Sequence, residues 1–196
     1  MSKNIFFISD THFGHANMIT FLNYDGTRMR PFSSVEECDE LMIENWNKIV
    51  KPSDRIFHLG DVVYKCKNRD EIMQRLNGEK ILIKGNHDRD QLGWYMKYFK
   101  DIRGTHHIDG NYLLGHFPVH PDSKGRFVRQ LHGHIHAQTV MKTMWYQTGN
   151  GIEPDPWYRN CCVEVNDYSP IPFEIIKKET ERLIEDGVII IPKKGV

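Results

Sequence analysis

The chain has 196 residues, of which 39% are hydrophobic and 27% charged, values ordinary for a globular protein that can bury a sizeable core. Lysine plus arginine and aspartate plus glutamate both number 26, so the formal net charge is zero. This balance disfavours nonspecific nucleic-acid binding and attraction to an anionic membrane surface. The length predicts one domain spanning residues 1–196.

Neither a membrane span nor an export signal is expected. The first apolar run, Ile5 to Ile8, is too short for a signal-peptide core, and no apolar stretch approaches the ~20 residues of a membrane helix. The four cysteines form no C-x-x-C pair, and adjacent Cys161 and Cys162 are poorly placed to bridge each other. These features predict a reduced, cytoplasmic protein without a thiolate metal site.

Strands and helices alternate in the first half of the chain. Ser34 and Glu37 form a capping-box pattern ahead of an amphipathic stretch, which predicts a helix there. In chain order, the predicted elements are a strand at 4–9, a short helical piece at 16–22, a loop at 24–30, a helix at 35–50, a strand at 55–59, a helix at 68–76, a strand at 80–84 and a helix at 88–99. Such alternation indicates βαβ units.

The second half is richer in strands. Predicted strands at 102–107, 112–116, 127–136 and 161–165 are followed by a helix at 171–185 and a strand at 188–191. Asp109-Gly110 predicts a hairpin corner between the first two strands. The irregular, aromatic segment 141–160 is expected to cover the apolar edge of a second sheet, with nucleobase stacking as the alternative.

Polar residues directly follow five of the predicted strands, and four of these polar groups come after a glycine. Glycine allows tight turning and close approach of the backbone at such positions. In open α/β sheets, ligands bind at the carboxyl ends of the strands. The polar groups are Asp10-Thr11-His12, Asp61, Asn86-His87-Asp88, His116 and His134-Ile135-His136.

The stretch LHGHIH, residues 131–136, places three histidines at alternating positions. If the stretch is extended, the rings of His132, His134 and His136 project to the same side. Neutral imidazole is the commonest protein ligand for transition metals, although a short motif can also arise by chance. The run therefore indicates a metal site only in combination with the other strand ends.

A two-metal site accounts for this combination of residue types. Carboxylate, imidazole and amide oxygen suit Zn²⁺, Mn²⁺ or Fe, whereas the lack of thiolate disfavours Cu(I) and iron–sulfur clusters. Two cations ~3.5–4 Å apart share a carboxylate and can stabilise the attacking and leaving oxygens of an in-line displacement at phosphorus. A hydroxide bridging the metals is the expected nucleophile, and a nearby histidine can protonate the leaving oxygen.

As a set, the motifs resemble those of the calcineurin-like metallophosphoesterases. They read Asp10-Thr11-His12, Gly60-Asp61, Gly85-Asn86-His87-Asp88, Gly115-His116 and Gly133-His134-Ile135-His136. The stretch at 161–165 is similar to the family's closing strand. The resemblance implies an α/β (α+β) fold, a four-layer sandwich of two mixed β-sheets flanked by helices, with a dimetal centre at one edge.

The resemblance also implies a role for each motif residue. Two divalent transition-metal ions per chain are implied (Mn, Zn or Fe, with Ni possible in vitro). His87 matches the family's non-ligand histidine that contacts phosphate and protonates the leaving group. His132 matches no family ligand and is expected to pack. One metal would be held by Asp10, His12, Asp61 and His136, and Asp61 would bridge to the second, completed by Asn86, His116 and His134.

The remaining polar residues have competing interpretations. His15, one loop from the first motif, and Arg28, on the predicted loop at 24–30, are candidate substrate contacts, since guanidinium fits phosphate oxygens; the alternatives are a surface position for His15 and solvation for Arg28. Arg30 either binds phosphate or is solvated, as most arginines are. His58, inside a predicted strand, is expected to be a hydrogen-bonded core histidine.

Two functions fit this pattern. The first is a dimetal phosphoesterase whose partner is a small phosphate ester, with a nucleotide phosphodiester favoured because the chain has little room for a capping domain. The second is a catalytically silent, metal-bound interaction scaffold on the same fold, which is expected to have lost ligands or the proton donor. The presence of Asp61, Asn86 and His87 favours the enzyme. The native metal, the oligomeric state and the identity of the ester stay open.

Overall fold

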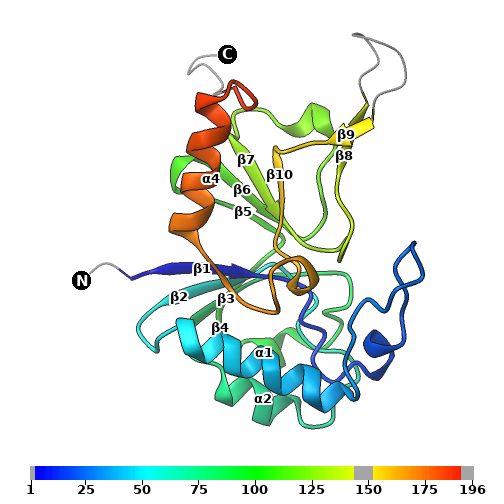
Figure 1. Ribbon diagram of the computed structural model, residues 1–196. Helices are drawn as coiled ribbons and strands as arrows, with labels where there is room; N and C mark the ends of the chain where they lie inside the picture. The colour runs from blue at the N-terminus through cyan, green and yellow to red at the C-terminus, as the bar shows by residue number, and fades with distance from the viewer. Residues whose placement is uncertain (1–2, 144–151, 191–196) are drawn as a thin grey trace.

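Two mixed β-sheets form the centre of the computed structural model, which describes residues 3–143 and 152–190 (Figure 1). The larger sheet has the strand order β11-β1-β2-β3-β4, in which β1 to β4 are parallel and β11 is antiparallel to β1. Its strands are β1 (Ile5–Ile8), β2 (Arg55–His58), β3 (Glu79–Ile83), β4 (Phe99–Arg103) and β11 (Ile171–Pro172).

The smaller sheet has the order β10-β7-β6-β5, with β5 antiparallel to β6 and the other pairs parallel. Its strands are β5 (Thr105–Ile108), β6 (Tyr112–Gly115), β7 (Arg129–His132) and β10 (Tyr158–Asn160). The 3-10 turn η2 (Asp109–Asn111) joins β5 to β6, which confirms the hairpin corner. A separate two-stranded ribbon consists of β8 (Met141–Thr143) and β9 (Ile152–Pro154).

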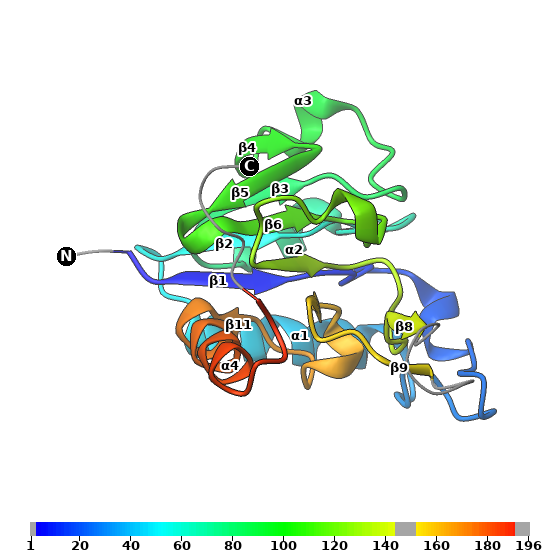
Figure 2. The ribbon, with the colours of Figure 1, turned by 90° about the horizontal axis from the view of Figure 1, so that it is seen from above.

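Helices pack around both sheets, so the expected mixed α/β fold class is confirmed. They are α1 (Val35–Ile49), α2 (Arg69–Arg75), α3 (Leu92–Tyr95) and α4 (Phe173–Glu185), with 3-10 turns η1 (Ala16–Ile19), η3 (Pro121–Ser123) and η4 (Val163–Val165). Figure 1 shows α1 and α2 on the outer side of the larger sheet and the smaller sheet on its opposite side. Figure 2 shows β2, β3 and β4 to one side of β1 and α4 with β11 to the other. Within the described residues, no helix is both long and apolar enough to cross a membrane.

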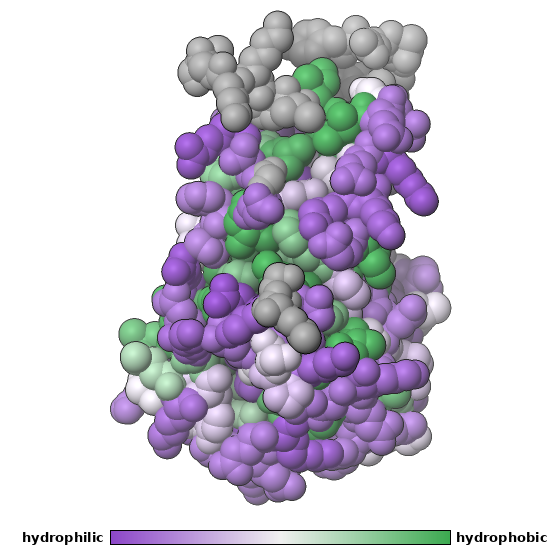
Figure 3. Space-filling view, turned by 90° about the vertical axis from the view of Figure 1, so that its left-hand side faces the viewer, coloured by the Kyte–Doolittle hydropathy of each residue, from purple (hydrophilic) through white to green (hydrophobic). Residues whose placement is uncertain are grey.

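The apolar core divides into layers that follow this arrangement. Between the two sheets, Phe7 and Phe57 of the larger sheet pack in one cluster with Leu114 and Leu131 of the smaller. A second cluster, which includes Trp46 of α1, fills the space between the helices and the larger sheet. Burial of apolar side chains on both faces of the larger sheet holds its parallel strands rigidly in place. On the side shown in Figure 3, hydrophilic side chains predominate over the lower, helix-bearing part.

Several expected elements differ in the structure. The stretch at 102–107 is divided between β4 and β5, so the chain passes from one sheet to the other at Gly104. The helix expected at 88–99 is reduced to α3, because Asp88 instead accepts hydrogen bonds from backbone N–H groups of Asp61, Val62 and Gly85. The helical piece expected at 16–22 is only the 3-10 turn η1.

The closing part of the chain also departs from expectation. In place of a strand at 161–165, strand β10 ends at Asn160, Cys162 makes a single bridge to Ser9, and η4 follows. Helix α4 begins at Phe173, after β11. Of the strand expected at 188–191, residues 188–190 form no strand, and residue 191 lies outside the described residues.

The described aromatic residues of the segment 141–160 pack against the smaller sheet, as expected. Trp157 and Tyr158 are buried in a cluster with Leu113 of β6, so they cover an apolar face of the smaller sheet. Trp145 and Tyr146 lie outside the described residues.

Candidate metal centre

The polar strand ends meet at one edge where the two sheets adjoin. Strands β1, β2 and β3 are parallel neighbours, so the segments that carry Asp10, Asp61 and Asn86 leave the larger sheet on the same side. Strands β6 and β7 are likewise parallel and deliver His116 and the residues after His132. Backbone hydrogen bonds from Asp10 to Gly60 and from Gly133 to His116 fix these ends against each other.

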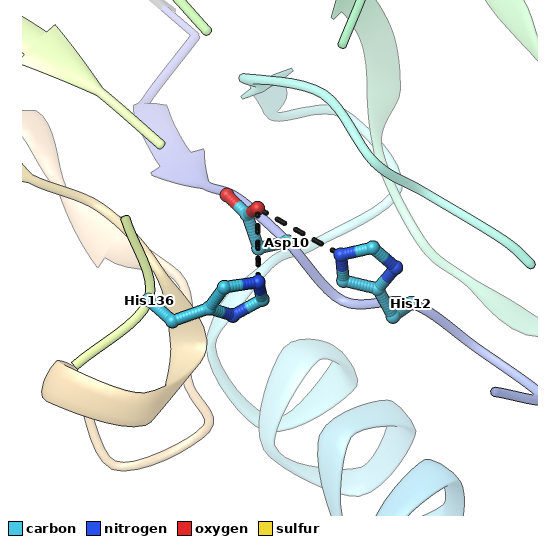
Figure 4. A group of neighbouring side chains, drawn as sticks. All are labelled: Asp10, His12 and His136. Carbon is cyan, nitrogen blue, oxygen red and sulfur yellow. Dashed lines mark ion pairs between the residues drawn. The ribbon is translucent and has the colours of Figure 1, made fainter. Parts of the chain in front are cut away.

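Asp10, His12 and His136 form the first close group (Figure 4). Asp10 Oδ1 lies 3.8 Å from His12 Nε2 and 3.9 Å from His136 Nε2. The other oxygen, Oδ2, accepts hydrogen bonds from Ser9 Oγ, the His134 backbone N–H and Cys162 Sγ. The carboxylate is therefore held through Oδ2, while Oδ1 faces the two imidazoles.

Asp61 lies between the first group and His116. Its Oδ2 is 3.5 Å from His12 Nε2 and 3.4 Å from His116 Nε2, and its Oδ1 accepts the His87 backbone N–H at 2.7 Å. Burial alone would raise the pKa of Asp61, but the hydrogen bond and charge of His116 and the charge of His12 outweigh it, lowering the pKa to about 2. Asp61 is therefore an anion with one oxygen shared by two histidines.

Acceptor atoms face one another around His116. Its Nδ1 lies 2.8 Å from the Leu59 carbonyl oxygen, which can only accept, so Nδ1 carries a proton. In the neutral ring, Nε2 is then an acceptor, 2.9 Å from Asn86 Oδ1 and close to Asp61 Oδ2. Burial opposes a charge on His116, but Asp61 and Asp10 raise its pKa. A proton or a cation between these acceptors would offset the repulsion among them.

The residues present fit a bound metal. Asp10 Oδ1 and both ring nitrogens of His12 are buried and have no hydrogen-bond partner among the described residues. Burial lowers the pKa of His12 well below its usual value, so its ring is a neutral donor of a lone pair. Buried polar atoms without a partner are costly, and a cation ligated by them would remove that cost. Carboxylate, imidazole and amide oxygen are ligands for Zn²⁺, Mn²⁺ and Fe.

The backbone is strained at most of the expected ligands. Five of the seven have a left-handed conformation with φ between 47° and 73°, which is uncommon for residues other than glycine. Such strain is typical of functional sites that the surrounding structure holds in place. These residues are Asp10, His12, Asp61, His134 and His136.

The left-handed residues correct the expected geometry of LHGHIH. Strand β7 ends at His132, and His134 and His136 have φ angles of 73° and 50°, so the run is not extended. His136 reaches Asp10, whereas the ring of His134 lies 5.2 Å from the ring of His116. The two histidines thus approach different groups because the chain turns between them, not through strand alternation.

Glycine is required at the turn itself. A Cβ atom on Gly133 would lie 1.9 Å from Ser9 Oγ and 2.3 Å from Asp10 Oδ2. A Cβ on Gly85 would lie 2.3 Å from Asp61 Oδ1. All three distances are far inside van der Waals contact, so the backbone can approach the carboxylates only without a side chain.

Comparison with known proteins agrees with this geometry. The family model of the calcineurin-like phosphoesterases matches residues 3–186. The chain belongs to the calcineurin-like phosphoesterase family. An uncharacterized protein of Methanocaldococcus jannaschii is 34% identical over 191 residues, covering 96% of this chain and 95% of the relative.

Similar proteins also occur in a mycobacterial phage and in Aquifex aeolicus. The gene 66 protein of Mycobacterium phage D29 is 29% identical over 190 residues, covering 80% of this chain and 90% of the phage protein. A crystal structure of a protein of unknown function from Aquifex aeolicus superposes with a TM-score of 0.63 at 27% identity, covering 90% of this chain and 99% of that one. The expected family is confirmed.

Of the two expected substrate contacts, His15 lies beside the candidate metal centre and Arg28 lies on an exposed loop. The ring of His15 packs 5.4 Å from that of His12 and lines the cavity beside it. Burial, with the charges of His87 and Arg30, lowers the pKa of His15 to about 4. Arg28 is exposed on the loop that pairs with Leu22, and it does not line this cavity.

His58 and His132, which lie outside the motifs, have structural roles. His58 is fully buried, accepts the Gly60 N–H at Nδ1 and bonds Thr11 Oγ1 through Nε2, so it is a hydrogen-bonded core residue. His132 is buried with Nδ1 bonded to the Gly133 carbonyl oxygen. His132 belongs neither to the first close group nor to the second, which comprises Asp10, Asp61 and His116.

A buried ion pair beneath the site was not expected from the sequence. Arg30, 1% exposed, donates to the backbone carbonyl oxygens of Asp10 and Thr11 and to Glu164 Oε1. The same Glu164 oxygen accepts His136 Nδ1 at 3.0 Å, which leaves Nε2 facing Asp10. Burial opposes ionisation of Glu164, but Arg30 and His136 lower its pKa to about 2. Both earlier interpretations of Arg30, as a phosphate ligand or as a solvated residue, are wrong.

Glu164→Gln is expected to weaken folding and metal binding together. The amide keeps the shape but leaves the buried Arg30 charge without its partner, a loss of about 3–5 kcal/mol in comparable buried pairs. Because Glu164 also orients His136, metal affinity should fall about 10–100-fold. Urea unfolding of the metal-free protein and metal titration of the folded protein measure the two effects separately.

Glu40→Gln is the matched control, because Glu40 pairs with Arg75 at the surface. An exposed pair contributes about 0–1 kcal/mol, so this variant should unfold nearly as wild type does and bind metal normally. If Glu164→Gln behaved like Glu40→Gln, the ion pair would have no part in holding the site.

Proposed function

We propose that this protein is a dimetal phosphoesterase that hydrolyses small phosphate diesters, nucleotide esters among them. Membership in the phosphoesterase family gives the reaction class. The observation that carries the proposal is the position of Asp61, whose Oδ2 lies within 3.5 Å of His12 on one side and 3.4 Å of His116 on the other. A single carboxylate oxygen between two groups of ligands is the arrangement that two adjacent cations require.

The chain's own residues divide between the two cations. When bound, the metals would supply Lewis acidity to a phosphoryl oxygen and lower the pKa of a water nucleophile. Asp10 is also close to both groups, so two carboxylates, not one, lie at the centre. One metal would be held by Asp10, His12, Asp61 and His136, and the other by Asp61, Asn86, His116 and His134.

His87 is placed to serve the leaving group. Its backbone N–H donates to Asp61 Oδ1, which anchors the residue at the site, and its ring lies 5.4 Å from that of His12. The side chain lines the cavity that opens beside His12 and His136. A histidine so placed, and not itself a ligand, would donate a proton to the departing oxygen.

The proposed partner is a small phosphate ester, and the proposed location is the cytoplasm. All four cysteines are unpaired and buried, which supports a reducing compartment. Equal numbers of acidic and basic residues support a small substrate in preference to a long polyanion.

Metal reconstitution tests the proposal. Metal-free protein is loaded with Mn²⁺, Zn²⁺, Ni²⁺ or Mg²⁺, its metal content is measured, and it is assayed on a panel of phosphate monoesters and diesters. We expect two metals per chain and hydrolysis restored by Mn²⁺ or Zn²⁺, with diesters preferred. Full loading without hydrolysis of any ester would support the silent scaffold instead.

A further inference from the structure

A cavity of about 520 Å³ extends away from the candidate metal centre on the His87 side. At its inner end it is lined by His12, His136 and His87. Its remaining wall comes from residues 14–18, from Phe21 and from Tyr64 and Lys65. The cavity therefore begins where the leaving oxygen would be protonated and continues over side chains that the proposed hydrolysis does not use.

Aromatic rings form a continuous wall along this cavity. The rings of His15 and Tyr64 lie 4.2 Å apart, and Phe21 packs edge-on against His15 at 5.9 Å. Tyr64 in turn packs edge-on against His87 at 5.3 Å. Phe21, at the far end of this row, is 43% exposed, although burial of such a large apolar ring would be favourable. The wall thus presents aromatic faces, on which a planar ring could stack, next to His87.

Backbone hydrogen bonds hold the segments of this wall together. Residues 12 and 13 pair with 61–63 beyond the end of the sheet, through hydrogen bonds from His12 to Asp61, Phe13 to Val62 and Tyr64 to Phe13. Asp39 of α1 accepts the Gly14 N–H at 2.8 Å and holds the following turn. The segments that carry His15 and Tyr64 are therefore fixed side by side.

The chemistry of the lining indicates the occupant. None of the residues that line the cavity is acidic, and Lys65 adds a positive charge above the Tyr64 ring. Asn17 contributes an amide, a group that can read the edge of a base. The volume suits one drug-sized ligand and not a polymer.

We infer that this cavity binds the leaving group of the substrate, and that this group is a nucleoside whose base stacks on Phe21, His15 and Tyr64. The placement of the nucleoside on the leaving-group side of phosphorus rests on the proposed hydrolysis. For a nucleoside methyl phosphate, water adds to phosphorus and the bond from phosphorus to the nucleoside oxygen breaks. The His87 proton goes to that oxygen, so the products are the free nucleoside and methyl phosphate.

Adenosine binding tests the cavity without any reaction. Adenosine has no phosphate, so calorimetric titration of the protein, metal-free and metal-loaded, reports the aromatic wall alone. Phe21→Ala and Tyr64→Leu should each weaken adenosine binding about 5- to 150-fold, the range given by stacking of one base on one ring. Phe21→Trp keeps a ring and should retain affinity. Tyr24→Ala, in an exposed residue outside this cavity, should change nothing.

The products of adenosine 5′-methylphosphate test the orientation. We expect adenosine and methyl phosphate, whereas adenosine monophosphate and methanol would place the nucleoside on the other side of phosphorus and overturn the inference. Binding of N-acetyl-tyrosinamide as tight as that of adenosine would also overturn it, because the wall would then select any aryl ring.

The two proposals can fail separately. If adenosine binds and Phe21→Ala weakens it, but no ester is hydrolysed, the cavity remains a nucleoside site, while the phosphoesterase function and the assignment of the nucleoside as leaving group both fall. If esters are hydrolysed but adenosine does not bind, the function stands and the cavity assignment falls.

Discussion

Asp61→Asn is expected to remove both metals and to abolish hydrolysis in one step. Asparagine keeps the shape but offers one amide oxygen where the carboxylate contacts His87 N–H, His12 and His116. Its NH₂ group must face either the His87 donor or the two imidazoles. Loss of outer-shell groups already costs about 10–100-fold, so hydrolysis should fall by more than about 100-fold. Elemental analysis and steady-state kinetics on the same preparations measure both losses.

His132→Ala is the matched control for Asp61→Asn. His132 is as buried as Asp61 and lies at the end of β7, just ahead of His134 and His136, but its Nδ1 bonds the Gly133 carbonyl oxygen. Removing it should lower the free energy of unfolding by about 1–3 kcal/mol and leave two metals bound. Loss of a metal from His132→Ala would mean that the ligands along this strand are wrongly assigned. One metal per wild-type chain at saturation would contradict the dinuclear centre.

His87→Ala should retain both metals and lose activity according to the leaving group. A general acid contributes about 10²–10⁴ in rate, and most where the leaving oxygen is strongly basic. An alkoxide or nucleoside oxygen leaves poorly without a proton, while nitrophenolate is already stable as an anion. The variant should therefore be impaired severely on alkyl and nucleoside esters and much less on nitrophenyl esters.

Metal content and kcat on both kinds of ester, in wild type and variant, decide the role of His87. His120→Ala is the control, because His120 is an exposed histidine on η3, and neither quantity should change. Equal losses of kcat on both ester types, with metals retained, would show that His87 positions phosphate or stabilises charge and does not deliver a proton.

The parallel core of the fold could be predicted from local sequence, and its edges could not. Strands β1 to β3 and helix α1 follow from apolar runs and from the Ser34 cap, whose side chain accepts the Glu37 N–H as expected. The division of 102–107 between two sheets has no local signal, because each half is an ordinary strand. Likewise η4 replaces a strand because Glu164 is drawn under the site by Arg30, a contact across 134 residues.

The candidate site shows the same contrast. That these polar residues gather at one edge could be predicted because each follows a strand and the strands are parallel, a rule that needs only chain order, whereas their roles as ligands are implied by the family resemblance. The direction of each side chain could not, because left-handed turns at residues such as His134 and His136 depend on packing from other segments. Arg30 carries no motif, and only its burial against Asp10, Thr11 and Glu164 reveals its role.

The candidate ligands are divided between two structural layers, and this division has a mechanical consequence. Asp10, His12, Asp61 and Asn86 approach the site from the larger sheet, and His116, His134 and His136 approach it from the smaller, across a core packed with apolar side chains. Cations bound there would cross-link the layers as a disulfide joins two segments, but reversibly. The strength of that link would follow the free concentration of metal, since a ligand that binds only the folded state stabilises it by mass action.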